Sequence, residues 1–516
     1  MSVGTRVQVS PRGYGCHHAD LSVTTRGERL NVHSSAVYAP NPSRGNYPAR
    51  MQSHLDSILK RIDSDERGAI ERLCDFLRIP SISTDPAHTA DVAHAAEWLV
   101  RDLRSMGFNA ASVPTIGHPM VLATHPGTGG IGAPRVLFYG HYDVQPADPI
   151  ELWDSPPFDP QLIDGPHGKR IVARGAVDDK GQVMMFIEAL RAWHEVAGGP
   201  PCPVTLMIEG EEESGSVSLE PFMNAHRKDL QCDVAVVSDT GMWDINTPAI
   251  TTSLRGLCYL EATLTGPSHD LHSGMYGGSL RNPINALAAM ITSMHDSSGR
   301  VAVKGFYDGV LEPTAEVLAS WQKLGFDEAE FLGEAGVRVG WGEVGRSCLE
   351  RTWSRPTFDC NGIFGGYTGI GAKTVIPSKA TVKFSCRLVA GQDPERIKSL
   401  VEAHLQAQVP PGYTLEIHSH GVNPAIHVRT DSPFVACASR ALKRVFGRDA
   451  ALIGTGGSIP AVGSIQRILG VDSLLVGFGL DDDRVHSPNE KFEVTCLMNG
   501  ARSHAAMLAE FGAMTT

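Results

Sequence analysis

The sequence reads Val136-Leu-Phe-Tyr-Gly-His141-Tyr-Asp143-Val-Gln-Pro146 where a run of apolar, β-prone residues gives way to polar ones. The run predicts a buried strand that ends near Gly140 and delivers a histidine and, two residues later, an aspartate. Residues i and i+2 of an extended segment point to the same side, so we expect the imidazole and the carboxylate to lie together. Such a pair suits a metal site, although on its own it is more often an incidental turn. The rest of the chain therefore has to supply partners.

Acidic residues follow other predicted strands. The run Glu211-Glu-Glu213 comes after a short buried strand predicted over residues 203–208, and Asp239 comes after another over 234–238. Asp178 likewise follows an apolar segment. Strands that alternate with helices predict βαβ units and a mainly parallel sheet, in which ligands bind beyond the carboxyl ends of the strands. The shared placement of these carboxylates favours one common site.

The pattern changes near Thr251, where the order becomes strand-helix-strand-strand-helix-strand and predicts a small antiparallel sheet with helices on one face. The expected fold is α/β: a main domain with a mainly parallel sheet and helices on both faces, into which an α+β domain is inserted. We assign residues 51–250 and 421–516 to the main domain and 251–420 to the inserted one. Residues 1–50 read as a disordered tail, or else translation begins at Met51.

Composition narrows the class of protein. The 516 residues exceed one typical core, and a net charge of −12 argues against nucleic acid as the main partner. Ten cysteines occur without CxxC spacing, which fits free thiols in a reducing compartment. No apolar run approaches the roughly 18 residues that span a bilayer, and residues 1–50 lack the apolar centre of a secretory signal. We expect a cytoplasmic protein that binds neither membrane nor nucleic acid.

The candidate metal ligands form a mixed nitrogen and oxygen set: His141, Asp178, Glu213, Asp239 and His486. Two imidazoles and three carboxylates suit zinc, manganese or cobalt rather than calcium or a thiolate site. With one bridging carboxylate, five residues give each of two metal ions three protein ligands and leave positions for water, which becomes hydroxide-like near neutral pH. Glu212, next to a ligand, is the candidate base that takes a proton from this water.

Each segment also has a simpler interpretation. Asp178-Asp-Lys-Gly181 alone reads as a solvated turn, the three glutamates as an acidic helix start, and His486 as a surface histidine in an acidic loop. Jointly these interpretations are disfavoured, because the segments lie at strand ends of one predicted sheet.

Several motifs in combination resemble the M20 family of dinuclear metallopeptidases: His141-Tyr-Asp143-Val, Arg174-Gly-Ala-Val-Asp178-Asp-Lys-Gly, Glu209-Gly-Glu-Glu-Glu-Ser-Gly-Ser216, Ser238-Asp239 and His486-Ser-Pro-Asn-Glu490. Others are similar to its carnosinase-like, cytosolic non-specific dipeptidase branch: Asp270-Leu-His-Ser-Gly274, Lys373-Thr-Val-Ile-Pro377, Lys383-Phe-Ser-Cys-Arg387-Leu-Val and Gly456-Gly-Ser-Ile-Pro460. The resemblance runs from about residue 55 to the end of the chain.

The resemblance implies a role for each metal ligand. His141 and Asp239 hold one ion, Glu213 and His486 hold the other, and Asp178 bridges the two. Zinc is the preferred metal, with manganese or cobalt as alternatives.

The resemblance also implies the catalytic residues. Asp143 orients the site from behind His141, and Glu212 is the general base that later passes its proton to the leaving amine. Glu211 stands where relatives often have an apolar or small residue, so the register of the three glutamates depends on the Ser-Gly-Ser that follows them. The peptide bond between Asp178 and Asp179 is expected to be cis.

For the smaller domain, the resemblance implies a lid and a homodimer surface. His272 reaches into the site of the partner subunit and stabilises the oxyanion, and Arg387 grips the substrate carboxylate. Thr374, His420 and Ser458 match further substrate contacts. Without the resemblance, Arg387 reads as a surface strand residue and Ser458 as a turn residue.

We therefore predict a dinuclear metal-dependent enzyme that hydrolyses dipeptides or short peptides with a free carboxylate, through a metal-activated water and Glu212. The alternative within the same fold is an amidohydrolase that cleaves N-acyl amino acids. The alternative of another class is an inactive, peptide-binding relative, against which the intact Glu212 and ligand set argue. The sequence leaves the physiological metal, the side-chain preference and the biological pathway undetermined.

Overall fold

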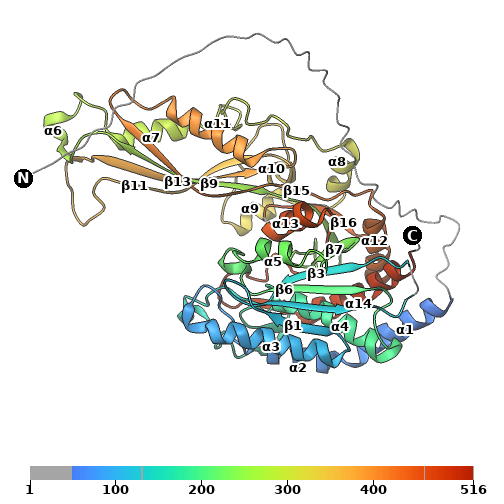
Figure 1. The fold of residues 1–516 in the computed structure, drawn as a ribbon. Coiled ribbons are helices and arrows are strands. Elements are labelled where there is room, and N and C mark those ends of the chain that lie inside the picture. The colour runs from blue at the N-terminus through green and yellow to red at the C-terminus, as the bar shows by residue number, and fades with distance from the viewer. Residues whose placement is uncertain (1–48, 130–131, 458, 515–516) are drawn as a thin grey trace, which may run out of the picture. The chain divides into compact units, whose positions relative to one another are not determined.

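The computed structural model describes residues 49–129, 132–457 and 459–514, so the tail predicted over residues 1–50 lies, as far as residue 48, outside the described residues. Two main sheets with separate hydrophobic clusters organise the described chain (Figure 1). The larger sheet follows the order β1 (Asn109–Val113), β2 (Met120–His125), β6 (Val204–Glu209), β3 (Val136–His141), β7 (Val234–Val237), β17 (Ser473–Leu475), β8 (Ala249–Leu254) and β15 (Ile426–His427), with β16 (Ala451–Thr455) beside β8.

The centre of the larger sheet is parallel. Strands β6, β3, β7 and β17 run in one direction, whereas β1 and β2 on one side and β15 on the other add antiparallel pairs. This arrangement confirms the predicted α/β class. Strand β3 is buried along its whole length, because side chains of both faces are covered: Phe138 stacks on Phe186 with ring centroids 4.1 Å apart, and Tyr139, which points to the opposite face, is also fully buried.

Helices cover the sheet in groups. Helices α4 (Lys180–Ala197) and α14 (Val494–Gly512) pack against each other and against α1 (Ala49–Ser64) and α12 (Pro433–Phe446). Helix α3 (Thr89–Ser105) packs on β1 and β2, and α5 (Leu219–Ala225) contacts α13 (Pro460–Leu469). Apolar residues recur at helical spacing from Ser53 to Leu77, and the structure divides this stretch at Asp65 into α1 and α2 (Glu66–Leu77).

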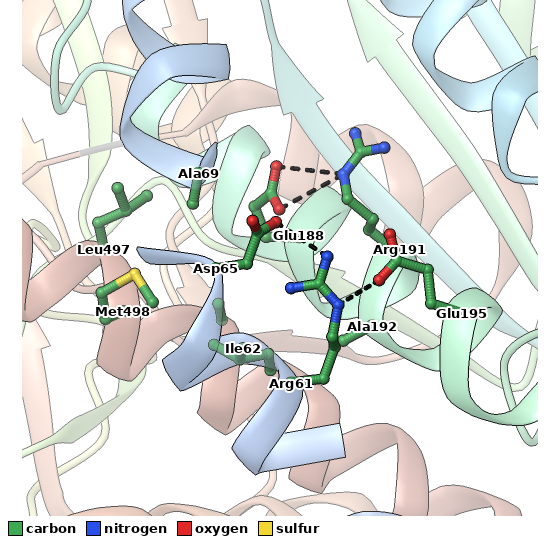
Figure 2. A pocket seen from close by; sticks show the side chains of 11 residues that line it. Arg61, Ile62, Asp65, Ala69, Glu188, Arg191, Ala192, Glu195, Leu497 and Met498 are labelled. Carbon is green, nitrogen blue, oxygen red and sulfur yellow. Dashed lines mark hydrogen bonds and ion pairs between the residues drawn. The ribbon is translucent and has the colours of Figure 1, made fainter. Parts of the chain in front are cut away.

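A cluster of charged side chains joins the helices on one side of the sheet. Figure 2 shows Arg61 paired with Glu195, and Arg191 paired with Glu188, beside the apolar side chains of Leu497 and Met498. Glu188 is 6% exposed and also accepts hydrogen bonds of 2.7 and 2.6 Å from Arg72. The cluster therefore links α1, α2 and α4 at their contact with α14.

The smaller sheet is antiparallel throughout, in the order β11 (Thr357–Gly365), β13 (Lys379–Leu388), β9 (Gly256–Thr265) and β14 (Thr414–Asn423). Helices α7 (Pro283–Thr292) and α11 (Pro394–Gln406) pack on it, and burial alternates along β9 because the helices cover one face. The predicted strand-helix-strand-strand-helix-strand order is confirmed. Strand β8, which spans the predicted boundary at residue 251, belongs to the larger sheet.

The less regular stretch of residues 300–354, within the inserted domain, contains three short helices. They are α8 (Ala315–Gln322), α9 (Glu328–Glu334) and α10 (Cys348–Trp353). Each begins after a capping residue, Thr314, Asp327 or Ser347, whose side chain accepts a backbone N–H of the first turn. Local capping thus accounts for helices in a segment with little apolar periodicity.

A small third sheet brings distant segments together. It joins β4 (Gln161–Gly165), β5 (Gly168–Val172) and β18 (Lys491–Glu493), and β18 runs antiparallel to β5. The segment that follows His486 therefore lies against the segment that precedes Asp178. In addition, β10 (Leu271–His272) pairs with β12 (Val375–Ile376).

Two whole-chain expectations bear on the described residues. The nine described cysteines are free thiols, as predicted. Among the helices of the described part of the chain, none is long and apolar enough to cross a membrane.

Candidate active site

The parallel strands deliver polar residues to one edge of the larger sheet. Strand β3 ends at His141, β6 is followed by a 3-10 turn at Glu212–Ser214, and β7 ends two residues before Asp239. Since β6, β3 and β7 are mutually parallel, their carboxyl ends meet at the same edge. The structure therefore brings these residues together where the sequence predicted.

Glu490 fixes the loop that carries Asp178. Its Oε1 accepts hydrogen bonds from the backbone N–H groups of Val177 (2.9 Å) and Asp178 (3.1 Å). Its Oε2 accepts from Gly175 N (2.9 Å) and from Arg174 Nη1 (2.7 Å). Both side chains of this ion pair are almost fully buried. Four donors on one carboxylate hold the Asp178 loop against the segment that follows His486.

Asp178 lies between two histidines. Its Oδ1 is 3.1 Å from His141 Nε2 and its Oδ2 is 2.9 Å from His486 Nε2. Two groups of possible ligand atoms result, one of His141, Asp178 and Asp239 and one of Asp178, Glu213 and His486, and within each group the atoms lie within 4.8 Å of one another. All five predicted ligands are thus adjacent, and Asp178 is common to both groups.

The two groups fit divalent metal ions. Burial and, to a smaller extent, the neighbouring Asp178 carboxylate raise the pKa of Asp239 to about 7. Glu213 Oε1 is buried and accepts no hydrogen bond among the described residues, although His486 Nε2 lies 3.4 Å away. Buried carboxylates that repel one another need a cation to offset their charge. Mixed imidazole and carboxylate donors are also the ligands of zinc and manganese sites.

The three consecutive glutamates have different surroundings. Glu211 accepts backbone hydrogen bonds from His118 N (2.9 Å) and Ser218 N (3.0 Å). Glu213 accepts a bond of 2.6 Å from Gln145 Nε2. Glu212 instead lines a cavity together with Asp178, and burial, reinforced by repulsion from nearby carboxylates, raises its pKa to about 8. Its carboxyl group is the one of the three that faces open space.

Asp143 is fully buried behind His141. Its Oδ1 lies 3.4 Å from His141 Nδ1, which leaves Nε2 of the imidazole facing Asp178. The same carboxylate accepts the backbone N–H groups of Glu212 (3.3 Å) and Glu213 (3.0 Å). Asp143 therefore contacts both the histidine and the backbone of the acidic turn.

Two buried acids near the site were not predicted from the sequence. Glu209 accepts hydrogen bonds from the Tyr139 hydroxyl (2.6 Å) and from Ser216 Oγ (2.7 Å). Asp179 Oδ2 accepts the backbone N–H of His141 (3.1 Å), and the peptide bond between Asp178 and Asp179 is cis, as the resemblance implied. For Glu209 the available signal was an acid at the last position of a buried strand, which is costly without hydrogen-bond donors.

A cavity of about 770 Å³ opens over this edge of the sheet. Asp178, Glu212, Asp239 and His486 line it, together with the glycine-rich residues 453–457 and apolar side chains of the segment 324–353. Its size is that of a small-molecule site.

The predicted substrate contacts lie on other elements. His272 on β10 is exposed and its Nδ1 accepts Gly274 N at the start of α6 (Ser273–Tyr276). Exposed Thr374 accepts Ser273 N through its carbonyl. Arg387 lies on β13, and His420 on β14 has its Nε2 3.3 Å from Glu261 Oε2. These four are not among the described residues that line the cavity. Ser458 lies outside the described residues.

Comparisons with known proteins agree with this geometry. A family model described as Peptidase family M20/M25/M40 matches residues 137–510. The Cys-Gly metallodipeptidase of Saccharomyces cerevisiae is 32% identical over 482 residues, which cover 89% of this chain and 98% of that protein. The Beta-Ala-His dipeptidase of Homo sapiens is 29% identical over 481 residues, 90% of this chain and 94% of that protein.

A solved structure shows the same fold. The M20 family metallo-carboxypeptidase Sso-CP2 from Sulfolobus solfataricus has a TM-score of 0.74 and 32% sequence identity. The superposition covers 86% of this chain and 99% of that chain. The likeness extends over nearly the whole length of these relatives.

Proposed function

We propose that this chain, which belongs to peptidase family M20/M25/M40, is a metal-dependent dipeptidase. Its substrates are dipeptides or short peptides with a free carboxylate. Metallodipeptidases among its full-length relatives support the reaction class. The observation that carries the proposal is Asp178, which presents one oxygen to each of two ligand groups beside Glu212.

In this proposal each ligand group holds one divalent ion. His141 and Asp239 would hold the first, Glu213 and His486 would hold the second, and Asp178 would serve both. We propose zinc, with manganese or cobalt as alternatives, because the donors are imidazole and carboxylate. When bound, the ions polarise the scissile carbonyl and acidify the attacking water.

Glu212 is the proposed general base. Its carboxylate accepts a proton from the water as the oxygen attacks the carbonyl carbon, and it donates this proton to the nitrogen as the C–N bond breaks. Asp143 is a positioning residue: it holds the imidazole of His141 and the backbone of Glu212 in one arrangement. Burial raises the pKa of the Glu212 carboxyl above its usual value, and bound cations would oppose this shift and favour the carboxylate form that a base requires.

The substrate contacts are proposed on the resemblance. Arg387 and Thr374, with His420 and Ser458, would bind the substrate carboxylate and backbone, and His272 would act in the site of a partner subunit. Residues 251–420 would then form the lid and the dimer surface of a homodimer. The separate hydrophobic cluster of the smaller sheet supports this division. Free thiols in the described chain support a cytoplasmic location.

Substrate panels test the proposal. Protein stripped of metal is reloaded with zinc, manganese or cobalt and offered dipeptides and N-acetyl amino acids. We expect dipeptide hydrolysis that depends on the added metal. Cleavage of N-acetyl amino acids alone would assign the chain to the amidohydrolases, and the absence of any hydrolysis would leave an inactive binding protein.

A further inference from the structure

One wall of the active-site cavity is apolar. It consists of Trp243, Leu324, Phe326, Phe331 and Trp353, here called the apolar wall. Neighbouring rings are in contact, with centroids 6.2 Å apart for Trp243 and Phe326 and 5.5 Å apart for Phe326 and Phe331. Leu324 and both tryptophans are only partly buried, and Phe331 is 46% exposed.

The apolar wall is held in place from behind. Trp353 packs edge-on against buried Trp321 with centroids 5.2 Å apart. On its other side it lies against Gly454, where a side-chain Cβ would come within 2.7 Å of Trp353 Cβ. Glycine at position 454 therefore allows the loop of residues 453–457 to approach the ring. A supported ring loses little conformational entropy when a ligand covers it.

The apolar wall is within reach of the reacting centre. Trp243 follows the proposed ligand Asp239 by four residues, so their Cα atoms are at most about 14 Å apart. The intervening segment is fixed by a hydrogen bond of 2.9 Å from Met242 N to Gly479 O. Glu212 lines the same cavity as this wall, so a dipeptide whose peptide bond lies at Glu212 has its side chains in the cavity that the wall bounds.

The charges around the cavity add a second selection. Asp327, Glu330 and Asp481 line it in addition to the ligand groups, and its described lining contains no lysine or arginine. Acidic side chains in the substrate would meet like charges here, whereas apolar side chains would bury exposed aromatic surface.

From this wall, and resting on the proposed dipeptidase function, we infer that the preferred substrates are dipeptides with an aromatic or large aliphatic side chain. Dipeptides that carry only small or acidic side chains are the poor substrates. A single methylene group in an apolar pocket changes the ratio of kcat/KM between two substrates about tenfold or more. The kcat/KM of a Phe or Leu dipeptide is therefore expected to exceed that of the Ala dipeptide by at least this factor.

Two matched series test the inference. The metal-loaded full chain is assayed with Ala-X and X-Ala, where X is Ala, Leu, Phe or Glu. We expect kcat/KM for Phe or Leu to exceed that for Ala at least about tenfold in one series, with Glu below Ala. Equal values for Ala and Phe in both series would overturn the inference while leaving the dipeptidase function intact. Failure to hydrolyse any of the dipeptides would overturn both.

Variants locate the preference on the apolar wall. Leu324→Ala and Phe331→Ala are each expected to reduce the kcat/KM ratio of Phe to Ala substrates at least about fivefold. Leu311→Ala is the matched control, because Leu311 is 61% exposed in the same segment and does not line the cavity. An equal loss for every substrate, with an unchanged ratio, would contradict the assignment, and melting temperatures verify that each variant is folded.

Discussion

At the scale of single residues, three adjacent glutamates differ because of the partners that the fold provides. Backbone N–H groups hold Glu211 from two sides, Gln145 and His486 flank Glu213, and Glu212 faces the cavity. Three consecutive glutamates thus have three different environments. The sequence alone allowed a shift of one position in the assignment, and the contacts support Glu212 as the base.

Replacing Glu212 separates chemistry from metal binding. We expect Glu212→Gln to retain two metal ions and to lower kcat about 10²–10⁴-fold, because an amide cannot take up the proton. Metal content is measured by elemental analysis and turnover with a dipeptide.

Glu211→Gln serves as the control for that experiment. Its amide oxygen can still accept one of the two backbone hydrogen bonds, so kcat is expected to remain within about tenfold of the parent. A larger loss of turnover in Glu211→Gln than in Glu212→Gln would assign the role of general base to Glu211 instead of Glu212.

His504 makes stability depend on pH. It is fully buried among aromatic rings, its Nε2 lies 3.0 Å from Ser238 Oγ, and burial lowers its pKa to about 3. Below the unfolded-state pKa of about 6.5, the unfolded chain binds a proton that the folded chain excludes, so stability falls as the pH decreases. Between pH 7 and pH 5 the loss from this residue is about 2 kcal/mol.

Denaturant unfolding of metal-stripped protein at both pH values measures this effect. We expect His504→Gln, which cannot titrate, to lose about 2 kcal/mol less than the parent between pH 7 and pH 5. Equal losses in the two proteins would show that the imidazole is protonated in the folded state.

At the scale of elements, strong periodicity decided what could be predicted from the sequence. Helix α3 follows apolar residues at helical spacing, and β3 is the strand predicted to end near Gly140, all of whose residues are buried. Strand β4 was not predicted, since its side chains are exposed on both faces and leave no alternation. Glu209 was overlooked because its donors, Tyr139 and Ser216, become neighbours only in the folded chain.

The charged cluster between the helices offers a test at this scale. We expect Glu188→Ala to lower the free energy of unfolding by about 2 kcal/mol, because it leaves Arg72 and Arg191 without their nearly buried partner. Glu71→Ala removes a pair in which both side chains are well exposed, and is expected to cost less than about 0.5 kcal/mol. Equal costs, measured by denaturant unfolding, would mean that the buried cluster adds nothing beyond a surface pair.

At the scale of the whole molecule, the edge of the smaller sheet is a candidate subunit interface. Strand β11 is an edge strand, and two of its own residues, Ile363 and Phe364, are 55% and 51% exposed. An exposed apolar edge strand is suited to pair with a second copy. This supports the proposed homodimer.

A charge on that edge should separate the subunits. We expect Ile363→Lys to raise the dimer dissociation constant at least about 10-fold, since a buried lysine has no partner there, and to reduce specific activity in parallel. Sedimentation velocity measures the association state. The control is Ile116→Lys, at an 80% exposed position in the loop between β1 and β2, which is expected to leave it unchanged. An unaltered dimer in Ile363→Lys would exclude β11 from the interface.

The position of Asp178 between two histidines also has a consequence for biosynthesis. His141 is synthesised before the smaller sheet, whereas His486 and Glu490, which complete the surroundings of Asp178, are synthesised after it. Between them the ribosome must produce the entire smaller sheet, from Gly256 to Asn423. A nascent chain can therefore assemble no complete pair of ligand groups until the smaller sheet has been synthesised.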